Sequence, residues 1–219
     1  MRRIIAATFT SLDGVMQAPG GPQEDPTGGF TLGGWTAPLF DEALVASMGE
    51  ILGRPFDLLL GRKTYDIFAA HWPYVSDLNS PIAATFNRVT KYVASRSSPK
   101  LEWQNSQLLG KDVVASLRKL KSEDGPDLLV QGSSDFLQTL WKESLVDEFS
   151  VLTFPVVLGK GKRLFGNGAV PTGLRLVKSR SFPTGVIVAN YQPDGVVRTG
   201  DFQLTEPTER ELDRRRTLT

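Results

Sequence analysis

Asp57-Leu58-Leu59-Leu60-Gly61-Arg62-Lys63-Thr64-Tyr65 is the stretch around which the rest of this chain is organised. Three consecutive leucines after a polar start are typical of a short strand that is buried on both faces, as in a mostly parallel sheet. Gly61 interrupts this apolar run, and apolar residues then return with helical spacing. The stretch therefore predicts a strand, a tight turn and a helix.

Two positive charges lie at the start of the predicted helix. Arg62 and Lys63 fall in its first turn, where the helix dipole is already positive and backbone N–H groups lack partners. Each cation costs about 0.3–1 kcal/mol at such a position. A bound phosphate would remove this cost, because N–H groups, the Thr64 hydroxyl and a guanidinium converge there. A solvated basic turn without a ligand explains the same residues equally well.

The composition limits the classes of function. The 219 residues are 40% apolar and include twelve phenylalanines, which is enough for one domain with a sizeable core, with or without a tail. A net charge of +1 gives no sign of nucleic-acid or membrane binding, and no apolar run approaches 18 residues. The absence of cysteine excludes disulfides, thiolate metal sites and a cysteine nucleophile, and it fits a reducing cytoplasm. His71 is the only histidine, so we expect no metal site.

The remaining elements follow from the apolar patterns. Residues 19–35 are rich in glycine and proline and predict a long loop of the kind that acts as a lid. Strands alternate with helices along most of the chain, and only strands follow at its end. We therefore expect an α/β sheet that is parallel first and antiparallel at one edge. The expected strands are 3–9, 57–60, 91–97, 127–132, 149–158 and a hairpin of 174–182 with 186–191, and the expected helices are 38–52, the one after Gly61, 112–121 and the one capped by 133–135.

Four loops fall at the carboxyl ends of the predicted strands, where ligands bind in α/β sheets. They contain Asp13, the pair Gly61-Arg62, the pair Ser95-Arg96, and Gly132 followed by Ser133 and Ser134. Glycine with two hydroxyls suits pyrophosphate or ribose oxygens. Neither a G-x-G-x-x-G nor a Walker A sequence occurs, which argues against a kinase, a GTPase or an ordinary Rossmann dehydrogenase. The Gly159–Gly166 loop is interpreted as a glycine-rich connection with solvated lysines.

Several short motifs, in this order and spacing, resemble a known family. They are Ser11-Leu12-Asp13-Gly14, Leu59 to Tyr65 with Trp72-Pro73, Tyr92 to Arg96, Val130 to Ser133 before Leu145 to Glu148, and Pro155 to Gly161 before Leu164-Phe165. From about residue 2 to residue 192 the chain resembles the dihydrofolate reductase-like superfamily, in its riboflavin-biosynthesis reductase (RibD C-terminal-like) branch.

This resemblance implies a three-layer fold, with a mixed, mostly parallel central sheet, helices on both faces and an antiparallel C-terminal edge. It also implies an NADPH-dependent reductase domain at 1–195, usually a homodimer, which leaves 196–219 as an extension. By the resemblance, Gly61, Arg62, Lys63 and Thr64 would hold cofactor phosphates. Ser95 and Arg96 would hold the adenosine 2′-phosphate, and Gly132 and Ser133, with Ser134 beside them, would lie against the pyrophosphate and nicotinamide.

The sequence says less about the residues that would bind the substrate than about those that would bind the cofactor. The acidic residue of dihydrofolate reductases has no secure counterpart, since Asp41 and Glu42 lie several positions away from the expected place. Asp13 is the candidate for orienting a substrate or relaying a proton, although Asp-Gly is also a common turn pair. We expect hydride transfer to a small heterocyclic (pterin- or pyrimidinone-like) or carbonyl substrate. One alternative is an NADP(H)-binding module without turnover. The other is a structural dimer with no ligand at the four loops that follow the predicted strands.

Overall fold

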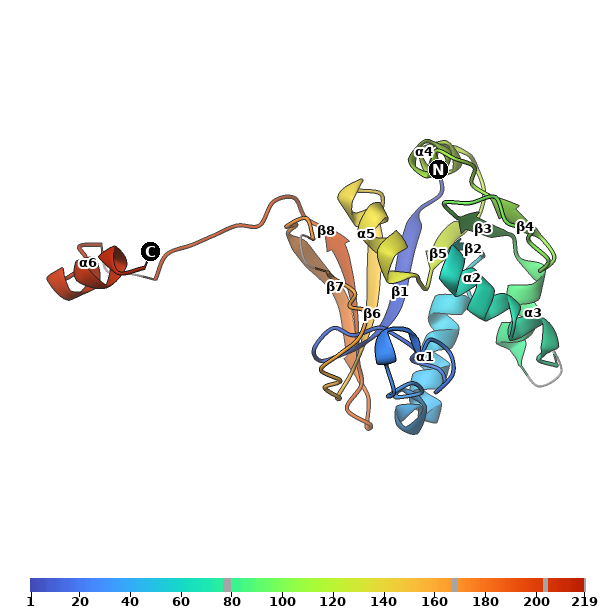
Figure 1. Cartoon of the computed structure of the whole chain (residues 1–219), viewed down its shortest axis with the longest axis horizontal. Coiled ribbons are helices and arrows are strands. Elements are labelled where there is room, and N and C mark those ends of the chain that lie inside the picture. Colours follow the sequence, from blue (N-terminus) through green and yellow to red (C-terminus); the bar gives the residue numbers. More distant parts are fainter. Residues whose placement is uncertain (77–79, 167–168, 203–204, 219) are drawn as a thin grey trace.

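The computed structural model describes residues 1–76, 80–166, 169–202 and 205–218. Its strands form one eight-stranded sheet with the order β4-β3-β2-β5-β1-β6-β8-β7 (Figure 1). The strands are β1 (Ile4–Ser11), β2 (Phe56–Gly61), β3 (Lys91–Ala94), β4 (Ser106–Leu108), β5 (Asp127–Val130), β6 (Glu148–Phe154), β7 (Leu174–Ser181) and β8 (Ile187–Pro193).

The direction of the strands confirms the expected mixed sheet. Every pairing among β1 to β6 is parallel, whereas β8 is antiparallel to β6 and β7 is antiparallel to β8. Leu58, Leu59 and Leu60 of β2 are fully buried, as predicted for a strand covered on both faces. Leu59 packs in the cluster formed with α4 and α5, while Leu58 and Leu60 pack on the opposite face with α2 and α3.

The helices cover both faces of the sheet, which completes the three layers. They are α1 (Glu42–Leu52), α2 (Arg62–Ala69), α3 (Pro81–Arg88), α4 (Val113–Ser122), α5 (Ser134–Lys142) and α6 (Glu209–Arg216), with short 3₁₀ turns at Thr27–Gly29, Ala37–Leu39 and Trp72–Tyr74. Helix α1 packs in a cluster with β6, β8 and the loop that precedes it.

Within the sheet and the helices that pack on it, two elements were not predicted, and several boundaries differ. Helix α3 buries only Ala83 and Phe86, too few residues to show a helical period, and β4 has no buried residue. The strands predicted to end at 97, 132 and 158 end at 94, 130 and 154. Pro155, which lacks an N–H donor, follows the last of these. As a result, the candidate residues after β3 and β5 lie in turns. The helix predicted from residue 38 begins at Glu42, because Asp41 caps it.

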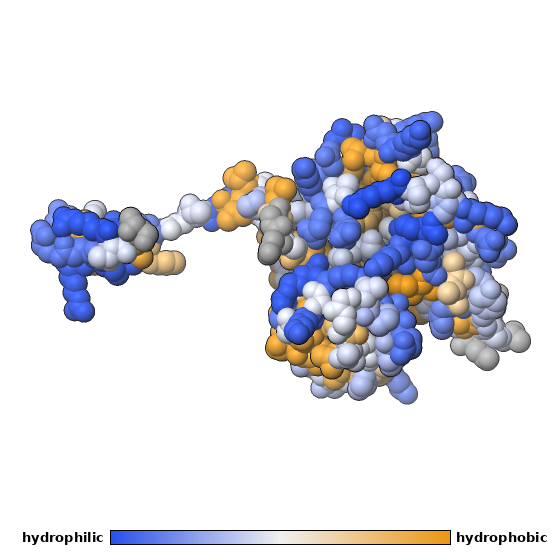
Figure 2. Space-filling model, in the orientation of Figure 1, coloured by the Kyte–Doolittle hydropathy of each residue, from blue (hydrophilic) through white to orange (hydrophobic). Residues whose placement is uncertain are grey.

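The chain leaves the sheet after β8. Figure 1 shows a segment that runs away from the body to α6, which has no buried residue among those described. The exposed side chains of Val196, Val197 and Phe202 lie along this segment, and Figure 2 shows hydrophobic residues there. Within the described residues no helix is long and apolar enough to cross a membrane, and no three histidine or acidic side chains gather as a metal ion would need.

Candidate functional site

A cavity of about 950 Å³ opens at the carboxyl ends of β2, β3 and β5. Nine of the ten residues proposed from the sequence line it: Gly61, Arg62, Lys63, Thr64, Ser95, Arg96, Gly132, Ser133 and Ser134. The parallel topology explains this, because strand ends that point the same way bring their turns to one edge of the sheet.

The turns after β2 and β5 touch directly. The two strands are neighbours, and the Gly61 N–H donates to the carbonyl oxygen of Gly132 over 3.3 Å. A Cβ atom on Gly61 would lie 2.2 Å from Ser133 Oγ, and one on Gly132 would lie 2.5 Å from Thr64 Oγ1. Only glycine fits at both positions. The first turns of α2 and α5 are therefore packed in direct contact, with no side chain at the two glycine positions. The peptide bond between Gly132 and Ser133 is cis.

Arg62 already has an anion within the chain. Its Nε atom lies 2.7 Å from Asp66 Oδ1, one turn further along α2. This exposed pair is worth about 0.3–0.5 kcal/mol, comparable with the cost of placing a cation at a helix N-terminus. Asp66 thus accounts for the charge of Arg62 without a bound ligand, contrary to what its place in the first turn of the helix suggested.

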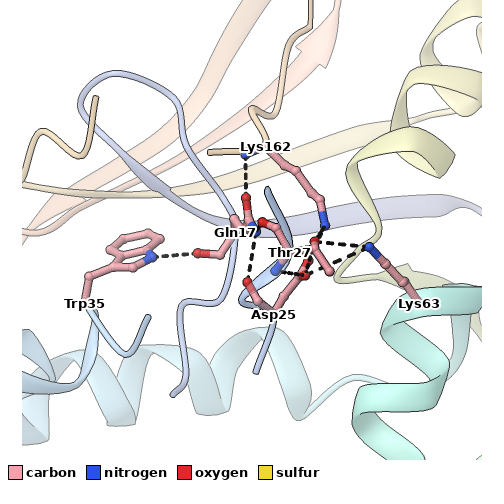
Figure 3. A network of polar contacts seen from close by, with 6 residues as sticks. All are labelled: Gln17, Asp25, Thr27, Trp35, Lys63 and Lys162. Carbon is pink, nitrogen blue, oxygen red and sulfur yellow. Dashed lines mark hydrogen bonds and ion pairs between the residues drawn. The ribbon is translucent and has the colours of Figure 1, made fainter. Parts of the chain in front are cut away.

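Lys63 points toward the 19–35 loop, which we call the lid (Figure 3), while 55% of its side chain stays exposed. Its Nζ atom lies 3.3 Å from Thr27 Oγ1 and 3.9 Å from Asp25 Oδ1. Lys162 Nζ bonds to the same two side chains. The neighbouring Lys162, and then burial, lower the pKa of Lys63. Burial opposes ionisation of Asp25, but hydrogen bonds from Lys162 and Thr27 outweigh it and lower the pKa of that carboxyl.

Gln17 fixes the base of the same loop. Its buried side chain donates to the carbonyl oxygens of Asp25 and Thr27 over 2.9 and 2.8 Å, and it accepts a hydrogen bond from the Lys162 N–H. Trp35 Nε1 donates to the Gln17 carbonyl oxygen over 2.9 Å (Figure 3). The Trp35 ring also packs edge-on against Phe154. Trp35 is thus a buried anchor, and the 19–35 loop is held against the cavity at several points.

Arg96 is a cation at this edge whose side chain has no partner among the described residues. It follows β3, is exposed and lines the cavity. Among the described residues, no ion pair or hydrogen bond occupies its guanidinium. Ser95 Oγ, beside it, accepts from the Ser97 N–H over 3.2 Å. Arg96 is therefore free to bind an anion.

Asp13 does not line the cavity. Its carboxylate accepts hydrogen bonds from Ser11 Oγ over 2.6 Å and from the N–H groups of Leu158 and Gly159 over 3.0 and 2.9 Å, and it pairs with Arg163. The Ser11 bond, followed by the Leu158 N–H, lowers the pKa of Asp13 to about 2. The residue is thus ionised at neutral pH and braces the turn after β6. This geometry favours the turn interpretation over the proposed proton relay.

Sequence reasoning missed Glu24 and Lys162, which both line the cavity. Glu24 Oε2 accepts from the N–H groups of Gly20 and Gly21 over 2.6 and 3.2 Å. Burial is the largest influence on Glu24 and raises its pKa. Neither residue lies in a segment with helical or strand periodicity. An acidic residue inside a predicted lid was the available signal for Glu24, and the lysines of the Gly159–Gly166 loop were the signal for Lys162.

Comparison with known proteins gives the family. The sequence profile of the RibD C-terminal domain matches residues 2–188. The uncharacterized protein YyaP of Bacillus subtilis (strain 168) is 28% identical over 200 residues, which cover 89% of this chain and 96% of YyaP.

Solved structures share the fold at low sequence identity. A putative riboflavin biosynthesis protein from Shewanella sp. PV-4 is 22% identical, with a TM-score of 0.62 over 89% of this chain and 99% of that one. Dihydrofolate reductase from Enterococcus faecalis, complexed with NADP(H), is 10% identical, with a TM-score of 0.54 over 88% of this chain and 96% of that one. The fold is thus dihydrofolate reductase-like. The chain belongs to the RibD C-terminal domain family.

Proposed function

We propose that this protein is an NADPH-dependent reductase that transfers a hydride to a small heterocyclic or carbonyl substrate. The observation that carries the proposal is the single cavity in which three strand-end turns meet beside the unpartnered Arg96. The family and the reductase-like fold support it, since the Enterococcus faecalis neighbour is a reductase complexed with NADP(H).

The residues of the cavity fit this cofactor. The volume of about 950 Å³ lies near the upper end of the roughly 300–1,000 Å³ range of ligand pockets. Gly61 and Gly132 allow the turns after β2 and β5 to pack directly against each other, so the N-termini of α2 and α5 lie side by side on the cavity wall, and a pyrophosphate there would meet the N–H groups of both helices. Arg96 with Ser95 suits the 2′-phosphate that distinguishes NADPH from NADH.

The chain contributes binding, orientation, exclusion of water and a proton. When bound, NADPH supplies the hydride. The loop held by Gln17 and Asp25 covers the cavity and limits the entry of water. Reduction of a C=N or C=O bond also needs one proton. Glu24, a cavity carboxyl whose pKa is raised, is the group we assign to this role in place of Asp13.

A fluorescence titration tests the proposal. Trp72 lines the cavity, so its emission should respond to a bound nucleotide. We expect NADPH to bind about tenfold or more tightly than NADH, and Arg96→Ala to weaken NADPH alone by about tenfold, because a charge-assisted hydrogen bond is worth about 1.5–3 kcal/mol.

Arg88→Ala is the matched control, because Arg88 is exposed at the end of α3 and does not line the cavity. Equal losses for both nucleotides would refute the assignment of Arg96, and no binding of either nucleotide would refute the function. NADPH binding with no oxidation of NADPH by any heterocyclic or carbonyl acceptor would favour the non-catalytic module.

A further inference from the structure

The cavity extends beyond the turns assigned to the cofactor. Its other part is bounded by α1, α2, α3 and the Trp72–Tyr74 turn, which share one buried cluster. Its lining consists of apolar and aromatic side chains: Phe9, Phe40, Met48, Leu52, Ile67, Phe68, Trp72, Ile82 and Phe86.

The positively charged side chains that line the cavity all lie in the part assigned to the cofactor or in the lid. The lysines and arginines among the described lining residues are Arg62, Lys63, Arg96, Lys111 and Lys162, and all of them lie at the strand-end turns or in the lid network. Ile67 and Phe68 come four and five residues after Lys63, so they lie roughly 6–8 Å further along the axis of α2. An anionic group on a substrate would therefore meet no cation from the walls of the apolar part.

The face of α1 that borders the cavity is also apolar. Leu44, Met48 and Leu52 recur every four residues along α1 and so share one side, and Met48 and Leu52 line the cavity together with Phe40, which precedes the helix. Asp41 is not on the cavity wall, because its carboxylate accepts from the Leu44 N–H over 2.7 Å as the helix cap. The wall of α1 consequently offers no carboxylate to pair with the amino group of a pterin.

The aromatic side chains pack on one another at the cavity wall. The rings of Phe68 and Phe86 lie 5.8 Å apart and only 20° from parallel, and Trp72 lies 5.0 Å from Phe86. Phe86 is buried beneath this group, whereas Phe68 and Trp72 are half-buried and supply its accessible aromatic surface. Aromatic faces stack well on a planar conjugated molecule, and burial of a neutral ring here is favourable, whereas an unpaired phosphate or carboxylate would lose its hydration without compensation.

We infer that the substrate is a neutral, planar, conjugated carbonyl compound of the quinone type, without phosphate or carboxylate. This inference rests on the proposed reductase function and specifies its substrate class. The reaction balances: the carbonyl compound gains a hydride from NADPH and one proton from Glu24 or water, and the products are the dihydro compound and NADP⁺.

Two ring compounds that differ by one charge test this inference. The probes are 1,4-naphthoquinone and 1,4-naphthoquinone-2-sulfonate, titrated against the full-length protein by Trp fluorescence with and without NADPH. Turnover is followed by the loss of NADPH absorbance. We expect the neutral quinone to bind at least tenfold more tightly than the sulfonate and to be reduced.

Met48→Lys supplies a cation at the cavity wall, and its long aliphatic stem suits the helix. It should reverse the preference in favour of the sulfonate. Val45→Lys, on the exposed side of α1, should change neither affinity. Circular dichroism and unchanged NADPH affinity show that each variant is folded.

The outcomes separate the inference from the function. If NADPH binds with the Arg96 dependence described above while the sulfonate binds as well as the neutral quinone, the substrate class is wrong and the function stands. If neither nucleotide binds, the function fails, and the direct quinone titration still decides whether the apolar part selects neutral rings.

Discussion

Arg62 and Arg96 are both arginines that follow the end of a strand, but only one has a partner within the chain. Asp66 binds Arg62, whereas no described residue binds Arg96. The two acids differ in their position instead: both accept backbone hydrogen bonds in a turn, but only Glu24 lines the cavity. At the scale of the residue, function follows from which charges the fold leaves available.

Glu24→Gln tests the assigned proton donor. Glutamine can still accept the hydrogen bonds of Gly20 and Gly21, so the lid should keep its structure. We expect kcat to fall about 100-fold, in the usual range for the loss of a general acid, with unchanged NADPH affinity. The wild-type rate should also decline as pH rises through the pKa of Glu24, and the variant should lose this decline. Glu42→Gln, outside the cavity, is the control; an equal loss in both variants contradicts the role.

Lys91→Met tests a buried cation. Lys91 is completely buried, donates to the carbonyl oxygens of Asn87 and Gln104 and lies 4.3 Å from the Trp103 ring centroid. Burial lowers its pKa from 10.5 to about 8, against the attraction of Asp57. The unfolded chain binds more protons than the folded one between these values, so the free energy of unfolding should rise as pH rises from about 8 to about 10.5.

Urea unfolding of both proteins across this pH range measures the effect. The rise should be present in the wild type and missing from Lys91→Met. Parallel pH dependence in the two proteins would show that Lys91 is not the responsible group.

At the scale of the element, the cavity depends on how two strand–turn–helix units meet. β2–α2 and β5–α5 lie side by side because β2 pairs with β5. Their turns approach so closely that neither has room for a side chain at Gly61 or Gly132. The contact between the turns, more than either turn alone, forms the proposed phosphate-binding surface.

Gly61→Ala tests this contact. The added methyl would collide with Ser133 Oγ and approach Phe136 Cβ to 3.0 Å, so we expect destabilisation by about 1–3 kcal/mol and weaker NADPH binding. Gly49→Ala is the matched control, because it lies exposed in α1 with nothing within 4 Å of a Cβ; it should stabilise by about 0.5–1 kcal/mol. Thermal unfolding and NADPH titration measure both effects. Normal nucleotide binding by Gly61→Ala would contradict the proposed surface.

Asp25→Asn tests the attachment of the lid. The change removes the carboxylate that faces Lys63 and Lys162. A hydrogen bond to a charged group is worth about 1.5–3 kcal/mol, so we expect hydrogen exchange in residues 19–35 to accelerate about tenfold or more. We also expect tighter NADPH binding, since Lys63 no longer shares its charge with the lid. Gln23→Ala, at an exposed lid position, should leave exchange unchanged; no acceleration in Asp25→Asn would refute the attachment.

At the scale of the whole molecule, two apolar surfaces are not covered by any part of the chain that the structure describes. Every residue of β7 is exposed, with Leu176 and Val177 about half accessible, and Val196, Val197 and Phe202 are exposed in the segment beyond β8. We propose that a second copy of the chain covers them, which agrees with the homodimer implied by the family resemblance.

Truncation after residue 195 tests both the domain boundary and this dimer. Gly195 pairs with Gly173 and remains, whereas α6 contributes no described buried residue. We expect residues 1–195 to unfold cooperatively at an unchanged temperature and to bind NADPH normally, but to dimerise more weakly than the full chain. Calorimetry and light scattering measure these properties. Loss of cooperative unfolding would refute the boundary, and a monomeric full-length chain would refute the dimer.

Much of the fold could be predicted because its elements carry strong local signals. The triple leucine of β2 and the apolar strand before Gly132 each agree with the element that forms there. Helix α5 also begins where it was predicted, after Ser133, but the Ser133 side chain makes no capping hydrogen bond. α3 and β4 bury too little to leave a pattern, and their positions depend on contacts with distant segments such as the Asn87–Trp103 hydrogen bond. The strand ends were placed too late because an apolar pattern does not show where pairing stops.

The sequence by itself determined most of the strands and helices, though not α3 and β4, together with the parallel sheet and its antiparallel edge. It also determined the edge of the sheet at which nine candidate residues gather, because burial and turn chemistry are local properties of the chain. Only the tertiary structure decided which charged groups are neutralised by others. Asp13 is bound by the turn at 158–163, and Lys63 meets Asp25 and Lys162 from loops far away in sequence. Electrostatic partnership depends on distances of a few ångströms between such segments, and those distances exist only after the chain has folded.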